Sequence, residues 1–111
     1  MTELADRHCH PYAKGEPPVT DARAAELLSQ LANWRRDPDE PRIAREFRFK
    51  DFRETMLFVN AAAWVADRED HHPEMVVGYN RCTVRYSTHS VGGLSENDFI
   101  CAARLDALIG A

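Results

Sequence analysis

Four side chains in the second half of the chain could transfer protons. The stretch "ADREDHHPEMVVGYNRC" places Asp70, His71 and His72 directly before Pro73, and His89 follows the next strand-like segment. Imidazole can both donate and accept a proton near neutral pH. Three histidines with a neighbouring carboxylate therefore indicate either metal-free general acid–base catalysis or a three-histidine metal centre.

The sequence leaves these two alternatives open, beside the simpler interpretation that each histidine is solvated or caps an element. Neighbouring residues of an extended segment point to opposite sides, so His71 and His72 are poorly placed to bind one ion. The run His8-Cys9-His10 could also hold a metal. Its position in a polar N-terminal arm argues against this, because a stable metal site needs fixed geometry.

A predicted β-hairpin explains why the histidines should meet. Residues 75–79 and 82–88 alternate between apolar and polar side chains, with a tight turn expected at Asn80-Arg81. Antiparallel pairing brings the start of the first strand beside the end of the second. The histidine pair and His89 should therefore lie together in one cavity at one end of the sheet.

The hydrophobic periods predict the remaining elements and the fold class. We expect a helix from Thr20 to about Asn33, a short strand around Trp34 and a second strand over 42–49, whose apolar face Arg45 interrupts. A helix should follow from Asp51 to Asp70. Ser95 should cap a last helix, with Asp98 in the capping-box position. The expected fold is α+β: a two-layer sandwich in the order α-β-β-α-β-β-α, with a four-stranded antiparallel sheet and helices packed on one face. Residues 1–19 should form a flexible N-terminal arm and residues 20–111 one domain.

The helix predicted over residues 52–69 is unusually apolar. Its predicted buried stripe is Phe52, Met56, Val59, Ala63 and Ala66, and further apolar side chains widen it. We expect the sheet to cover one side and a second copy of the chain the other, so that the protein forms a homodimer or homotetramer through this helix and the sheet edges.

Composition excludes several classes of protein. The chain has 111 residues and a net charge of −4, which argues against direct nucleic-acid binding. No apolar run is long enough to span a membrane, and the N-terminus lacks the apolar stretch of a secretory signal. The odd number of cysteines, Cys9, Cys82 and Cys101, indicates free thiols in a reducing cytoplasm.

The segment "FRFKDFRET…EDHHPEMVVGYNRCTVRYSTHSVGGLSENDF" strongly resembles the pterin-4a-carbinolamine dehydratases. That family's signature is His-His-Pro, five residues, an aromatic residue, nine residues, His, then eight or more residues and Asp. Here it reads His71-His72-Pro73, Tyr79, His89 and Asp98. The resemblance covers roughly Leu27 to Leu108 and also includes "YSTH" and "GLS".

The resemblance implies a reaction and a set of site residues. A 4a-hydroxytetrahydrobiopterin loses water to give quinonoid dihydropterin, in tetrahydrobiopterin recycling, without cofactor or metal. The implied catalytic residues are His71, His72 and His89; the implied substrate-binding residues are Asp70, His71, His72, Ser87, Thr88, His89 and Ser90. Ser90 departs from the acidic residue that the animal members have at this position. Asp98 would support the site.

Roles within this set are less defined. We expect His72 or His89 to be the acid and His71 to orient or bind the substrate, and Asp70 would stabilise a charged imidazole if it lay beside one. Trp34 matches a family tryptophan and could either stack on the pterin or belong to the core.

The resemblance also implies an alternative function. The animal enzymes serve as dimerisation cofactors of a homeodomain transcription factor, so a non-catalytic assembly or coactivator module on the same fold is the alternative hypothesis. Retention of the three histidines favours the enzyme, because binding through a helix face requires none of them.

Overall fold

The chain folds into helices and strands whose order matches the sequence prediction. The structure, a computed structural model, describes residues 3–110. Its main elements are α1 (Asp21–Leu28), β1 (Arg35–Arg36), β2 (Ile43–Arg48), α2 (Phe52–Glu69), β3 (Glu74–Val77), β4 (Arg81–Tyr86) and α3 (Glu96–Leu108), with short 3₁₀ helices at Leu4–Asp6 and His89–Val91.

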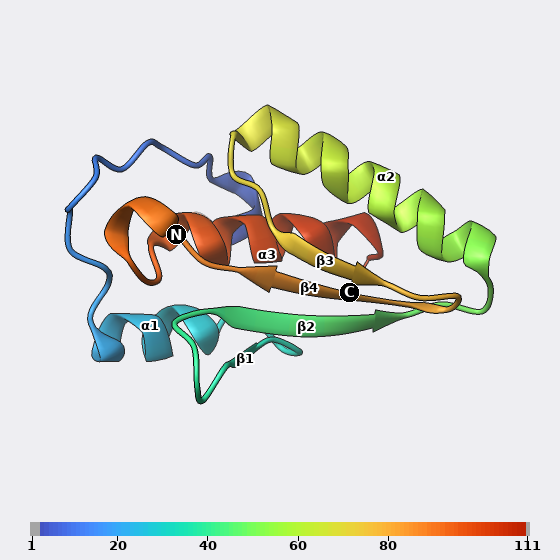
Figure 1. The fold of residues 1–111 in the computed structure, drawn as a ribbon, viewed down its shortest axis with the longest axis horizontal. Coiled ribbons are helices and arrows are strands. Elements are labelled where there is room, and N and C mark those ends of the chain that lie inside the picture. Colours follow the sequence, from blue (N-terminus) through green and yellow to red (C-terminus); the bar gives the residue numbers. More distant parts are fainter. Residues whose placement is uncertain (1–2, 111) are drawn as a thin grey trace.

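One antiparallel sheet organises the fold (Figure 1). Its strand order is β1-β2-β4-β3, so two hairpins join through the long pairing of β2 with β4. Ile43 lies opposite Tyr86 in this pairing, and Val77 lies opposite Cys82 in the β3–β4 hairpin. The predicted α+β class with a four-stranded antiparallel sheet is confirmed.

The core lies between the sheet and α3. Alternate residues of β2 and β4 point toward the helices, as a period of two requires. The central helix α3 contributes a nearly continuous buried run. These core side chains are Ile43, Phe47, Cys82, Val84, Tyr86, Phe99, Ile100, Cys101, Ala102 and Leu105.

The charged residue that interrupts β2 is paired inside the protein. Arg45 donates from Nη1 to Asp106 Oδ1 of α3 at 2.6 Å, and its guanidinium lies 4.2 Å from the ring centre of Phe47. Trp34 Nε1 donates to the same Asp106 oxygen at 2.9 Å. The interruption in the apolar pattern thus marks a contact between sheet and helix.

The structure corrects the predicted boundaries at two places. The helix expected to reach Asn33 ends at Leu28. The β3–β4 turn is centred on Tyr79-Asn80 rather than on Asn80-Arg81, since Gly78 N donates to Arg81 O at 2.8 Å. Asn80 does not adopt a positive φ in this turn.

The buried face of α2 also differs from the prediction. It consists of Thr55, Phe58, Ala62, Val65, Ala66 and Glu69. Of the predicted stripe only Ala66 is buried. Phe52, Leu57 and Trp64 remain exposed, Trp64 by 61%. Ten of the eleven residues from Met56 to Ala66 are apolar, so the pattern could not tell which face of α2 meets α3. Oligomerisation through the outer face stays a prediction. Among the described helices none combines the length and apolar character needed to cross a bilayer.

From Leu4 onward the N-terminal residues pack against the domain, whereas the sequence predicts a flexible arm there. Leu4 is buried in the core, and the 3₁₀ helix around it contacts α3. Gly15 N donates to Ser90 O at 3.0 Å, and Val19 N donates to Leu94 O at 2.9 Å. We call residues 7–15 the N-terminal strap; Figure 1 shows its chain passing beside the end of the sheet where β4 ends.

Candidate active site

The end of α2 sets the direction of the two adjacent histidines. Asp70 takes the left-handed conformation at φ 50° and ψ 44°, and His71 N donates to Ala66 O at 3.1 Å. This is the hydrogen bond that ends many helices in a Schellman motif. Pro73 then disfavours helical geometry at His72, so the chain leaves extended and the two rings diverge.

His71 is held by a buried carboxylate. Its Nε2 lies 2.6 Å from Asp98 Oδ1, and its ring stacks on Tyr86 with centroids 5.5 Å apart and an interplanar angle of 8°. The His71 side chain is only 11% exposed. Asp98 also accepts from Thr88 Oγ1 and from Ser95 N, both at 2.9 Å. The predicted capping box of α3 is confirmed, and the same carboxylate fixes an imidazole.

The Asp98 contact defines which nitrogen of His71 is free. When Asp98 is ionised it can only accept hydrogen bonds, and Nε2 of His71 then carries the hydrogen. Nδ1 is then the atom left to bind a ligand or exchange a proton. Such fixation of the tautomer by a partner carboxylate is a common way to orient a functional histidine.

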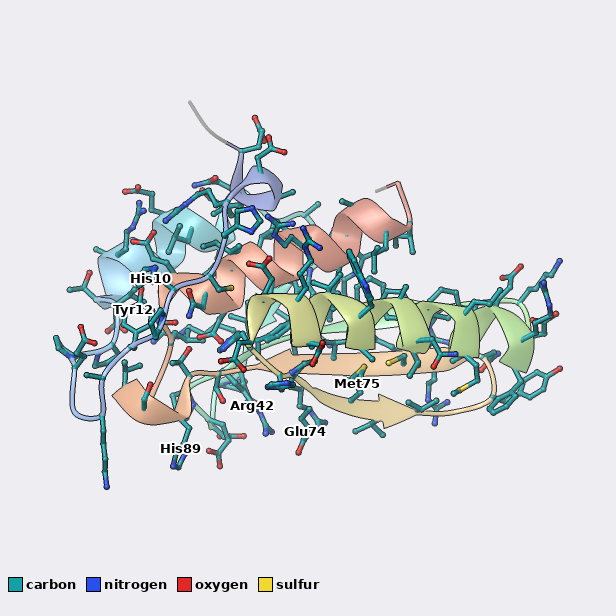
Figure 2. All side chains as sticks on the ribbon, turned by 90° about the horizontal axis from the view of Figure 1, so that it is seen from above. His10, Tyr12, Arg42, Glu74, Met75 and His89 are labelled. Atoms are coloured by element: carbon teal, nitrogen blue, oxygen red, sulfur yellow. The ribbon has the colours of Figure 1, made fainter. Side chains whose placement is uncertain are left out.

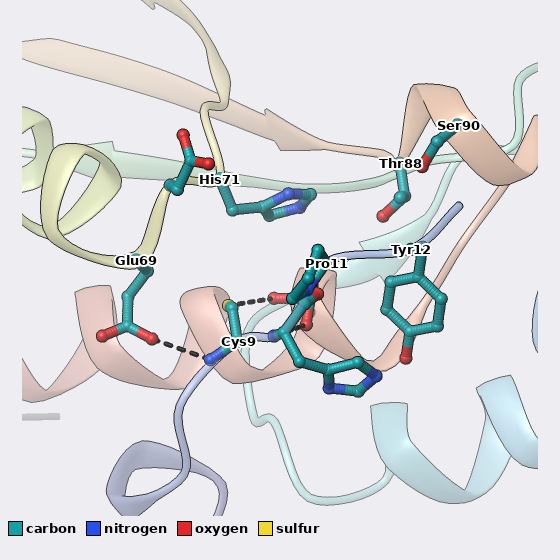
Figure 3. Close-up of a pocket in the computed structure, with 10 residues that line it drawn as sticks. Cys9, Pro11, Tyr12, Glu69, His71, Thr88 and Ser90 are labelled. Carbon is teal, nitrogen blue, oxygen red and sulfur yellow. Dashed lines mark hydrogen bonds between the residues drawn. The ribbon is translucent and has the colours of Figure 1, made fainter. Parts of the chain in front are cut away.

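Two hollows lie on the two sides of the loops that carry the histidines. One, of about 310 Å³, is lined by Arg42, His72, Pro73, Glu74, Arg85, Ser87 and His89; we call it the outer hollow. The other, of about 390 Å³, is lined by Cys9, His10, Pro11, Tyr12, Glu69, Asp70, His71, Thr88, Ser90 and Asn97; we call it the inner cavity (Figure 3). Figure 2 shows His89 pointing away from His10 and Tyr12.

The prediction that all three imidazoles share one cavity is therefore wrong in one respect. His72 and His89 line the outer hollow together, whereas His71 lines the inner cavity. The hairpin does bring the distant segments together, as predicted. Successive residues of an extended chain face opposite sides. His72, Ser87 and His89 therefore face the outer hollow, whereas His71 and Thr88 face the inner cavity.

The structure also places Asp70 and Trp34, whose roles the sequence left open. The carboxylate bound to an imidazole is Asp98, not Asp70, which lines the inner cavity at the turn after α2. Trp34 is 5% exposed, contacts Phe47 and Tyr86, and lines neither hollow. Of the two alternatives left open for Trp34, the contacts favour the core.

Sequence reasoning missed several lining residues. The strap contributes Cys9, His10, Pro11 and Tyr12 to the inner cavity, and two arginines, Arg42 and Arg85, line the outer hollow. The run "HCHPY" was the only signal for the strap, and the sequence analysis considered it only as a metal site and argued against that. Among residues 3–110 no group of three potential ligands is close enough to hold a metal ion.

Glu69 anchors the strap and predicts a pH dependence of stability. Its side chain is almost fully buried, which by itself would raise the pKa, but hydrogen bonds from Cys9 N and His8 and the charge of Arg104 bring the pKa below its ordinary value. A carboxyl with a lowered folded pKa stabilises the fold above its unfolded pKa and loses that contribution as the pH falls through the folded pKa.

We therefore expect the thermal midpoint of the wild type to exceed that of Glu69→Gln at pH 7. The difference should shrink as the pH falls below about 4.5, the ordinary value for glutamate. Thermal unfolding from pH 7 to pH 3 measures this. A constant difference between the two proteins across the range would show that the Glu69 charge contributes nothing.

Comparison with known proteins identifies the relatives of this chain. The family described as pterin 4 alpha carbinolamine dehydratase matches residues 17–108. A protein of Nitrosomonas eutropha named for the pterin-4-alpha-carbinolamine dehydratases is 55% identical over 109 residues, which cover 98% of this chain and 96% of that protein. The crystal structure of a transcriptional coactivator/pterin dehydratase from Brucella melitensis matches with TM-score 0.81 and 36% identity, over 84% of this chain and 99% of that one. A pterin dehydratase-like protein described as a RuBisCO assembly factor in the alpha-carboxysome matches with TM-score 0.62 and 26% identity, over 73% of this chain and 94% of that one.

Proposed function

The chain belongs to the pterin 4 alpha carbinolamine dehydratase family, and from this premise we propose that it is a hydro-lyase that removes water from a 4a-hydroxytetrahydropterin, as in tetrahydrobiopterin recycling. In this reaction the C4a–O bond breaks while the lone pair of N5 forms a double bond to C4a. The leaving hydroxyl must gain a proton, and N5 must lose one. The enzyme therefore needs one proton donor and one acceptor close to adjacent atoms of the pterin.

The observation that carries the proposal is the pair of histidines in the outer hollow. His72 lies just before β3 and His89 just after β4, so the antiparallel hairpin places both at one end, where they line one hollow of about 310 Å³ together with Ser87. One imidazolium can protonate the hydroxyl on C4a while the second, neutral imidazole takes the proton from N5. The hydroxyl on C4a and the proton on N5 sit on adjacent atoms of the pterin. Two imidazoles that line the same hollow could therefore reach both.

His71 takes a positioning role in this proposal. Its bond to Asp98 and its stacking on Tyr86 hold residue 71 firmly, and residue 72 follows directly. Asp98 likewise accepts from Thr88, which lies directly before His89. One buried carboxylate thus holds the neighbours of both proposed catalytic residues, so that the two rings keep a constant separation.

The direct test of the proposed function is turnover of chemically generated 4a-carbinolamine. We expect the protein to accelerate its dehydration well above the spontaneous rate, followed by the absorbance change of the quinonoid product. A purified, folded protein that leaves the spontaneous rate unchanged would refute the enzymatic proposal.

Metal removal provides a second prediction. We propose that the histidines act without a metal, so dialysis against EDTA should leave kcat/KM unchanged within about twofold. The same measurement after adding back Zn²⁺ serves as the control. Loss of activity with the chelator and its recovery with zinc would instead favour the three-histidine metal centre.

The second candidate function is assembly through the exposed face of α2. The Brucella and carboxysome relatives are described as a coactivator and an assembly factor, and α2 exposes Phe52, Leu57 and Trp64. An assembly function predicts that charged replacements on this face abolish association, whereas alanine at His72 and His89 has no consequence. If the protein is a dehydratase, alanine at His72 or His89 should lower turnover, whereas charged replacements on the exposed face of α2 should leave turnover unchanged.

A further inference from the structure

The N-terminal strap is fastened to the domain by side chains that bind its backbone. Cys9 N donates to Glu69 Oε1 at 2.8 Å. Asn97 of α3 binds both sides of His10, since its Oδ1 accepts from His10 N at 3.1 Å and its Nδ2 donates to His10 O at 2.7 Å. Arg104 Nε donates to Arg7 O at 2.9 Å. These bonds hold the strap beside α3.

This arrangement brings two cysteines into contact that lie far apart in the sequence. Cys9 Sγ lies 3.3 Å from Cys101 Sγ. A disulfide has an S–S distance of about 2.05 Å, so the two sulfur atoms need to approach by little more than about 1 Å. Cys9 lies outside any helix or strand, so a small backbone shift can bring it closer. The third cysteine, Cys82, is buried inside β4.

The two sulfur atoms differ in their access to small molecules. Cys9 is partly exposed and lines the inner cavity of about 390 Å³, as Figure 3 shows. Cys101 is fully buried in α3 behind it. A small oxidant that enters the cavity therefore reaches Cys9 first and finds Cys101 directly behind.

We propose that Cys9 and Cys101 form a redox-active dithiol, which a hydroperoxide converts into an intramolecular disulfide that links the strap covalently to α3. The proposal does not depend on the dehydratase activity. Its consequence is structural: the linked strap becomes a permanent wall of the cavity that contains His71.

The proposed chemistry proceeds in two balanced steps. The Cys9 sulfur attacks the outer oxygen of the hydroperoxide ROOH, the O–O bond breaks, and the products are Cys9 sulfenic acid and ROH. The Cys101 sulfur then attacks the sulfenic sulfur, the S–S bond forms, and the S–O bond breaks. The released hydroxide takes the Cys101 proton and leaves as water. Two thiols are oxidised by two electrons, and one peroxide is reduced.

The environment of Cys101 supports this order of events. The hydrogen bond with Cys9 and burial both raise the pKa of Cys101. Because Cys101 is fully buried behind Cys9, the oxidant meets Cys9 first. Sulfenic acids condense readily with a neighbouring thiol. Contact between the two sulfur atoms then favours closure of the disulfide over further oxidation of Cys9.

The experiment treats the reduced, full-length protein with one to five equivalents of hydrogen peroxide and counts thiols after denaturation. We expect the count to fall from three to one and the mass of the chain to fall by two hydrogen atoms. Peptide mapping should find Cys9 joined to Cys101 and Cys82 free. The midpoint of thermal unfolding should rise by at least about 5 °C and return on reduction with dithiothreitol.

Single serine variants provide the matched controls. Cys82→Ser should still lose two thiols at the wild-type rate, whereas Cys9→Ser should lose neither of its remaining thiols under the same treatment. Cys9→Ser changes only a partly exposed residue, so it tests the proposal even if Cys101→Ser fails to fold. A disulfide between chains, oxygen added to Cys9 without cross-linking, or three unreacted thiols would each overturn the proposal.

Discussion

Alanine at either His72 or His89 should lower kcat/KM for carbinolamine dehydration by about 10²–10⁴-fold, because each removes one of the two proposed proton-transfer groups. His72 is exposed, and His89 also lies at the surface in the outer hollow, so neither replacement opens a cavity in the core. The thermal midpoint should therefore stay near that of the wild type. Initial rates over pH 5.5–8.5 measure the effect, and loss of one limb of the pH profile would identify which histidine acts as acid and which as base.

The matched control is the same replacement at a histidine outside both hollows. His8→Ala removes a largely exposed ring that contacts Glu69, and it should keep the wild-type rate within about twofold. His71→Ala should retain more activity than His72→Ala if His71 only positions its neighbours. Wild-type rates in both His72→Ala and His89→Ala would exclude the outer hollow as the catalytic centre. The inner cavity with His71 would then be the remaining candidate.

Asp98→Asn should be the most destabilising single change in the site. Asp98 is fully buried and accepts hydrogen bonds from Thr88 and Ser95 in addition to its contact with His71. Asparagine keeps the size but replaces one acceptor oxygen with a donor, so at least one of these buried partners loses its bond. With hydrogen bonds to charged groups worth about 1.5–3 kcal/mol each, we expect the free energy of unfolding to fall by about 2–5 kcal/mol.

Denaturant unfolding of Asp98→Asn measures this loss, and Asp67→Asn is the matched control. Asp67 is an exposed carboxylate on α2, where the same change should cost less than about 0.5 kcal/mol. Turnover by the folded fraction of Asp98→Asn should also fall, because residues 71 and 88 lose the carboxylate that holds them. Equal stability of the two variants would contradict the proposed role of Asp98 as the joint anchor of both loops.

Local patterns were enough to predict most of the fold. Thr20, Asp51 and Ser95 each begin a helix as N-cap, because capping depends on a side chain and a backbone donor only a few residues apart. The alternation along β2 and β4 likewise indicated which side chains enter the core. The turn after β3 was misplaced by one residue, since neighbouring turn positions in "GYNR" differ too little in sequence for local rules to separate them.

The helix pattern was less informative in the middle of α2, where nearly every residue from Met56 to Ala66 is apolar. The inner face of α2 carries Thr55 and Glu69, two polar residues that a hydrophobicity pattern assigns to solvent. Both are buried because they meet specific partners: Thr55 Oγ1 donates to Tyr79 O, and Glu69 accepts from Cys9 N. These partners lie 24 and 60 residues away in the sequence, so the hydrophobic period of α2 cannot reveal them.

The sequence by itself determined the order of elements, the meeting of the 70–73 and 87–90 loops and the identity of the residues those loops carry, because hairpin pairing and capping are short-range effects. Only the tertiary structure decided how those residues divide between the two hollows, which carboxylate holds His71, and that the strap brings Cys9 onto Cys101. Each of these depends on the direction of a side chain relative to an element distant in the chain. Such directions are settled by packing against α3 rather than by any neighbour in sequence.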